Sequence, residues 1–155
     1  MKRILAFILI ISVFVTAFSA CSDNTATANI NPAEAAQTIL DSVEFRDTLI
    51  SVEGAAAENI YMLDDNIISY CIYISGSGAT AEEIAVLKVS DTNKAQTNIL
   101  DKRLEELAFR YESYVPAEMV KIQNPVIITQ GDIIIMVLAD DAESAEKAVK
   151  SVMGK

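Results

Sequence analysis

The run IIIMVL at residues 133–138 is apolar at every position. Side chains of a strand alternate between the two faces of a sheet, so a strand of this composition makes both faces hydrophobic. Such a sheet needs a cover on each face, because large apolar surfaces are not left in water. The run therefore predicts a sheet that is packed on both sides.

Two strand pairs are predicted around this run. Residues 126–129 precede it, and Gly131 between them can adopt the positive φ of a tight hairpin. Residues 67–75 are rich in Ile and Tyr, which favours a strand, and residues 84–89 have the same character. A loop rich in serine and glycine separates this second pair. The sequence therefore predicts two hairpins.

Three helices are predicted from capping signals and helical periodicity. Asn31 caps a helix that is expected to reach about residue 49, with Gly54 as its far limit. A second helix is expected over about residues 92–114, with a buried stripe at Leu100, Leu104, Leu107 and Tyr111. Asp140 and Glu143 form a capping box for a third helix, which ends near residue 153.

The order is a helix followed by two strand-strand-helix units, which predicts an α+β domain. We expect a four-stranded, mainly antiparallel sheet with both later helices on one face. The other face is then covered by the first helix, or it stays exposed as an apolar patch that binds a partner or ligand. The sequence leaves both alternatives open.

The beginning of the chain predicts export. Lys2 and Arg3 precede an apolar run at residues 4–18, and small residues then lead to a cysteine, which is the layout of a secretory signal peptide. Phe18-Ser19-Ala20-Cys21 resembles the lipobox of bacterial lipoproteins, in which the chain is cut before a diacylated cysteine. This resemblance implies a signal peptide at residues 1–20, lipidation of Cys21 with fatty acids such as palmitate, and a chain held on the outer face of the cell membrane.

The segment after Cys21 differs in composition from the rest. Residues 21–31 are nearly all small and polar, which predicts a flexible tether, and residues 32–155 have the length of a single domain. Removal of Lys2 and Arg3 leaves 10 basic against 22 acidic side chains, a net charge of −12. Such a domain is repelled by nucleic acid, so we expect no nucleic-acid partner.

Catalytic chemistry is poorly supported by the residues. The chain contains no histidine, so the usual triads and the commonest zinc ligand are missing. The adjacent acids at residues 64–65, 82–83 and 140–141 occur where turns or helix caps are expected. Residues 76–78 lack the ending of a phosphate-binding loop, and Cys71 is expected to be a buried apolar residue. We expect no cofactor and no metal site.

Several motifs resemble an uncharacterised family of cell-envelope lipoproteins found mainly in Gram-positive bacteria. They are the lipobox, Asn31-Pro32, residues 61–64, the stretch SGSGATAEEIA at residues 75–85, and Tyr114-Val115-Pro116. The resemblance covers nearly the whole mature domain, and it implies no assigned activity. It directs attention to residues 79–85 and 114–116.

The resulting hypothesis is a membrane-anchored, non-catalytic binding or accessory module that contacts an envelope protein, a peptide or a small ligand. The alternative is a cell-envelope hydrolase that uses carboxylates such as Glu82 or Glu83. The expected binding surface lies on the sheet face, the serine- and glycine-rich loop and the end of the second helix. Its predicted residues are Tyr73, Ser75, Gly76, Gly78, Thr80, Glu82, Glu83 and Tyr114.

Overall fold

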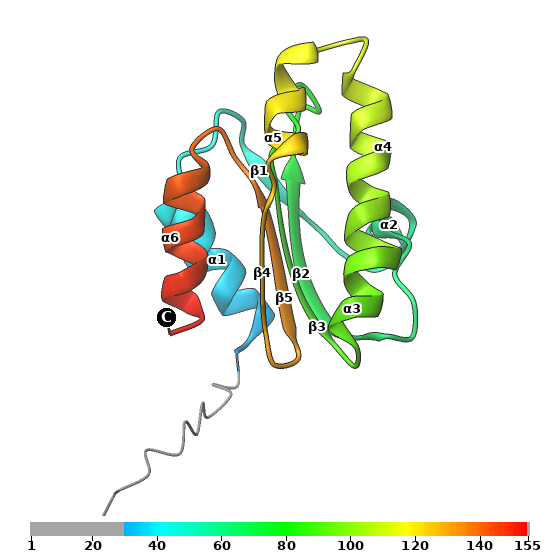
Figure 1. Cartoon of the computed structure of the whole chain (residues 1–155), viewed down its shortest axis with the longest axis vertical. Coiled ribbons are helices and arrows are strands. Elements are labelled where there is room, and N and C mark those ends of the chain that lie inside the picture. Colours follow the sequence, from blue (N-terminus) through cyan, green and yellow to red (C-terminus); the bar gives the residue numbers. More distant parts are fainter. Residues whose placement is uncertain (1–29, 155) are drawn as a thin grey trace, which may run out of the picture.

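The computed structural model describes residues 30–154, which form an α+β domain around one antiparallel sheet (Figure 1). Its strands are β1 (Leu49–Val52), β2 (Ile67–Ser75), β3 (Glu83–Val89), β4 (Val126–Gln130) and β5 (Ile133–Leu138). Their order across the sheet is β1-β2-β3-β5-β4. The two predicted hairpins are therefore present, and β3 and β5 join them at the centre.

The sheet has five strands, so the prediction of four is wrong. The first helix, α1 (Pro32–Ser42), ends well before residue 49, because Val43 turns to extended backbone. Leu49 then begins β1, a short β-branched and apolar segment that pairs with the end of β2. Gly54 does not limit α1 but begins α2 (Gly54–Tyr61) with a φ of 54°.

One face of the sheet carries Ala85, Leu87, Ile134 and Met136, all fully buried. It is covered by α2 and by a continuous helical segment made of α3 (Thr92–Ala95), the π-helical turn η1 (Gln96–Leu100) and α4 (Asp101–Tyr111). The 3-10 turn η2 (Pro116–Glu118) and α5 (Met119–Gln123), which the sequence did not predict, complete this layer. The second predicted helix is confirmed, but it ends at Tyr111.

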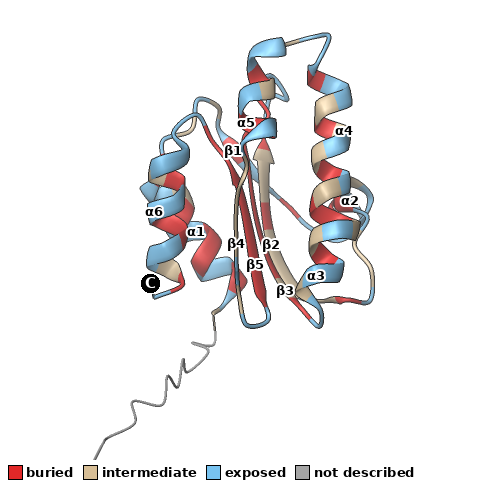
Figure 2. Cartoon of the chain, viewed as in Figure 1, coloured by how far each residue is buried: buried red, intermediate tan, exposed pale blue. Residues whose placement is uncertain are grey.

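The opposite face carries Ile84, Val86, Ile133, Ile135 and Val137. Figure 2 shows this face covered by α1 together with α6 (Ala142–Val152), whose buried sides are lined mostly by small residues. The expected cover by the first helix is confirmed. The expectation that both later helices share one face is wrong, because the helical segment that ends with α4 packs on the first face and α6 packs on the second.

Two local features concern the beginnings of α6 and β2. Asp141, not Asp140, caps α6, since its carboxylate accepts the N–H of Ser144 at 3.0 Å. A bulge between Ile67 and Ser69 interrupts the alternation of β2, and Ile68 is left 59% exposed.

Within residues 30–154, no helix has the length and apolar character needed to cross a membrane. The signal segment and the lipobox lie outside the described residues.

Candidate functional site

In the loop between β2 and β3, backbone N–H groups donate hydrogen bonds to nearby protein side chains. Asp47 Oδ2 accepts the hydroxyl of Ser75, the hydroxyl of Ser77 at 2.6 Å and the Ser77 N–H at 3.0 Å. The N–H groups of Gly78 and Ala79 donate to serine hydroxyls at 3.0 and 3.1 Å. Because these donors are occupied, the loop does not form a phosphate cradle. It is a hydrogen-bonded hairpin loop, as the sequence indicated.

Asp47 gives this loop a predicted pH dependence. Hydrogen bonds from Ser75 and Ser77 lower the pKa of Asp47 from 3.8 to about 2. Because the folded pKa is the lower one, the stabilisation is present above pH ~4 and is lost as pH falls toward about 2. The free energy of unfolding, measured by urea denaturation, should therefore fall between about pH 4 and pH 2 in the wild type, and we expect Asp47→Asn to make this fall smaller. Asp65→Asn, on an exposed turn, should keep the wild-type acid dependence; a parallel change in both variants would contradict the assignment.

Glu82 is fully buried behind this loop, so it is neither a turn residue nor a surface residue. Its carboxylate accepts the backbone N–H groups of Arg46 and Asp47, each at 3.0 Å, and the hydroxyl of Thr80 at 3.0 Å. The carboxylate therefore anchors the segment that leads into β1. These hydrogen bonds compensate the burial of the carboxylate, so the role of Glu82 is structural.

Lys121 lies beside Glu82 in a group of charges that is buried except at Asp140. Its Nζ is 2.8 Å from Glu118, 2.8 Å from Asp140 and 3.7 Å from Glu82. Burial alone would lower the pKa of Lys121, but Asp140 and Glu118 raise it above its ordinary value. Glu118 also accepts the N–H of Ala81 at 2.8 Å. Glu118 therefore joins η2 to the β2–β3 loop, and the Lys121 ammonium of α5 holds Glu118 in place.

Glu83 is buried on the other side of β3 and pairs with Arg103 of α4. Arg103 Nε donates to Glu83 Oε2 at 3.1 Å, and a second guanidinium nitrogen donates to Oε1. The Tyr61 hydroxyl donates to Oε2 at 2.6 Å, and burial followed by the Glu83 charge raises the pKa of Tyr61 well above 10.0. The guanidinium lies 5.3 Å from the Tyr61 ring centroid, a cation–π contact. This group connects α2, β3 and α4.

The predicted binding residues are thus divided by the structure. Ser75, Thr80, Glu82 and Glu83 are buried, which corrects their assignment to a binding surface. Tyr73 is half-buried against the second face, whereas Gly76 and Gly78 are exposed. Tyr114 is 87% exposed and follows the end of α4, where the Tyr111 hydroxyl lies 2.9 Å from the Gly78 carbonyl. The loop and the α4 end are therefore neighbours.

Cys71 is less buried than the sequence predicted, whereas Asp64 lies in a turn as expected. Cys71 is half-buried against the second face, and burial raises the pKa of its thiol, which disfavours the reactive thiolate. Asp64 accepts the N–H of Asn66 at 3.0 Å in a turn. It also pairs with Lys94 at 3.2 Å.

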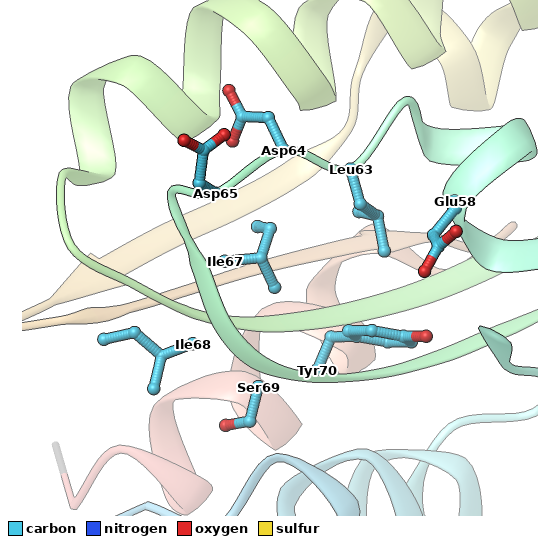
Figure 3. Close-up of a pocket in the computed structure, with 8 residues that line it drawn as sticks. All are labelled: Glu58, Leu63, Asp64, Asp65, Ile67, Ile68, Ser69 and Tyr70. Atoms are coloured by element: carbon cyan, nitrogen blue, oxygen red, sulfur yellow. The ribbon is translucent and has the colours of Figure 1, made fainter. Parts of the chain in front are cut away.

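A pocket that the sequence did not indicate lies where β2 begins. It has a volume of about 640 Å³ and joins α2, the following turn and the first half of β2. In Figure 3, Leu63, Ile67 and Tyr70 surround the space, with acidic side chains around it. The lining residues are Glu58, Leu63, Asp64, Asp65, Ile67, Ile68, Ser69 and Tyr70.

The adjacent edge of β2 has no strand partner in residues 30–154. β1 pairs with Ile72 through Ser75 and its last pair is Val52 with Ile72, so the first half of β2 extends past the end of β1. A second hollow of about 310 Å³ on this edge is lined by Gly54, Tyr70 and Cys71 among others. Within the described range, residues 67–71 pair with β3 on one side only. This part of β2, which we call its unpaired half because its outer edge has no partner in the described part of the chain, lies between the two hollows.

A comparison with known protein families matches residues 41–139 to a domain of unknown function, DUF4358. The chain belongs to this family. No curated protein and no solved structure matches the chain. The expected resemblance to an uncharacterised family is confirmed at this level, while the lipoprotein character and the Gram-positive origin stay predictions.

The DUF4358 match contains all five strands, the 640 Å³ pocket and both buried ion-pair groups, apart from Asp140. It leaves out α6 and nearly all of α1, the two helices that cover the second face. The matched part of the chain therefore includes the pocket and the unpaired half of β2, together with the helices of the first face.

Proposed function

We propose that this DUF4358 protein is an exported, lipid-anchored accessory protein whose domain binds a partner and does not catalyse a reaction. The observation that carries the binding role is the unpaired half of β2 beside the 640 Å³ pocket. Unpaired strand edges are templates for additional strands, and proteins normally protect them. Here the bulge between Ile67 and Ser69 protects the beginning of β2, and the edge at Tyr70 is left open next to a hollow.

The docking surface is the sheet edge and not a sheet face. Helices cover both faces of the sheet, and the central residues Ile72, Ala85, Val86 and Ile135 are fully buried. This removes the exposed apolar face as the place of binding. The edge of β2 offers backbone donors and acceptors, and Ile68 adds an exposed apolar side chain.

The geometry favours binding over the alternative carboxylate hydrolase. Glu82 and Glu83 are 0% and 2% exposed, and each is engaged by cations or backbone donors. A carboxylate pair that cleaves a glycosidic bond must face its substrate across a gap of about 5–9.5 Å. Chemistry at these two residues would first require their buried ion pairs to open, so we do not propose it.

The anchor rests on the sequence Phe18-Ser19-Ala20-Cys21, and its test is the mass of the mature amino terminus from a native host. We expect loss of residues 1–20 and a diacylated Cys21 in the membrane fraction. Cys21→Ala should abolish the modification and the membrane retention, and the internal Cys71→Ala variant should keep both. Unmodified Cys21 in the wild-type chain would contradict the anchored role, leaving the binding role of the β2 edge to be tested separately.

A further inference from the structure

The geometry of the β2 edge points to one class of ligand, and this inference rests on the proposed binding role. We propose that the unpaired half of β2 binds an extended segment of a cationic partner protein, which pairs with β2 beyond the end of β1. The partner segment occupies the position next to β2 that β1 would occupy if it were longer, and its side chains enter the pocket beside β2. The mode is strand addition to a sheet edge.

The hydrogen-bonding direction of β2 supports this geometry. The Ser75 N–H donates to Glu82 O at 3.0 Å, on the side of β3. Backbone groups in an antiparallel strand alternate in direction, so those of Ile74, Ile72 and Tyr70 point to the outer side. Ile74 and Ile72 of β2 each face a residue of β1, whereas Tyr70 lies beyond the end of β1. The outward backbone groups at Tyr70 are therefore available to an added strand.

The pocket gives the added strand a place for side chains. Leu63, Ile67 and Tyr70 are half-buried apolar residues that pack against the first face, and they form the floor. Tyr70 is fixed there, because its hydroxyl accepts the N–H of Gly54 at 3.0 Å. Successive residues of a bound strand point to opposite sides, so every second residue would face this floor. An alternating apolar and polar segment fits best.

The charge around the pocket selects a cationic partner. Glu58, Asp64 and Asp65 line it, and within residues 30–154 only Asp64 of these three forms an ion pair, with Lys94 at 3.2 Å. A second copy of this chain would bring the same acids together, and each mature copy carries a net charge of −12, so a second copy is disfavoured as the partner.

The other edge of the sheet, β4, is less open than the β2 edge, since Gln130 Nε2 donates to Met153 O at 3.0 Å and α6 packs beside β4.

The test measures binding of a labelled ten-residue peptide of alternating lysine and valine to the purified full chain in an uncharged detergent, by fluorescence anisotropy. We expect saturable binding that weakens with added salt. Glu58→Gln with Asp65→Asn should weaken it about fivefold, since each exposed charge contributes little. The matched control, Glu143→Gln with Glu146→Gln, removes the same charge from α6 and should bind like the wild type.

Peptides with altered backbones separate strand addition from charge attraction. The same peptide with N-methyl groups at alternate residues keeps its lysines, and we expect its affinity to fall at least about tenfold. Unchanged affinity of the methylated peptide, or an equal loss in the α6 control, would overturn the proposal. Binding of a glutamate–valine peptide in its place would overturn the cationic ligand but keep the binding role. The chain could instead bind none of these peptides and form dimers that Glu58→Gln with Asp65→Asn strengthens. That result would overturn both the cationic ligand and the binding role.

Discussion

Arg103→Met lowers the free energy of unfolding by about 3–5 kcal/mol, the expected cost of removing one partner from a buried ion pair. Glu83 is 2% exposed, so its carboxylate has no water to replace the two guanidinium hydrogen bonds. The Tyr61 hydroxyl remains as a donor, but a neutral donor does not balance a buried charge. Urea denaturation, with the circular dichroism of the helices as the signal, measures the change.

Arg110→Met is the matched control on the same helix. Arg110 is exposed and pairs with Glu106 at 2.8 Å, four residues earlier, so its loss should cost only about 0.5 kcal/mol. The double variant Glu83→Leu with Arg103→Met should recover most of the stability, because an apolar pair leaves no charge unpaired. Equal effects of Arg103→Met and Arg110→Met would contradict the role given to the buried pair.

The elements with strong local signals were the ones the sequence predicted well. The run at residues 133–138 became the buried strand β5, and Gly131 formed the hairpin turn with a φ of 59°. The cover on the second face by α1 was also confirmed. Local signals failed at β1, because its four residues directly follow a helix pattern and become a strand only by pairing with β2. Tertiary pairing of this kind leaves little trace in a short segment.

The candidate site could be predicted less well, because it depends on chain segments that meet only in the fold. Glu82 and Glu83 stand beside a loop, and their burial follows from Arg46, Arg103 and Lys121, which come from distant segments. One signal was present: Arg103 falls on the buried stripe of its helix, between Leu100 and Leu107. A charged residue on such a stripe indicates a buried partner. The open half of β2 had no signal, since it results from the shortness of β1.

Val149→Asp is expected to have an effect as large as Arg103→Met, although α6 lies outside the DUF4358 match. Val149 is fully buried between α6 and the second face of the sheet. An aspartate there would bury a carboxylate among apolar residues, and the loss of packing and the desolvation together should cost about 3–5 kcal/mol. This is a large part of the roughly 5–15 kcal/mol that stabilises a typical domain. Thermal unfolding of the full chain, followed by circular dichroism, measures it.

Lys150→Asp supplies the control, because Lys150 is the next residue on α6 and is exposed to solvent. It pairs with Glu146 at 2.6 Å, and the new like-charge pair should cost only a few tenths of a kcal/mol, about 0.5 at most. If Val149→Asp were as mild as Lys150→Asp, α6 would not be needed as a cover, and the DUF4358 part would be stable with one face of its sheet open. A large difference between the two variants would mean that this chain needs α6 to close the core that holds the β2 edge in place. The cover of the second face would then be essential, although α6 lies outside the family match.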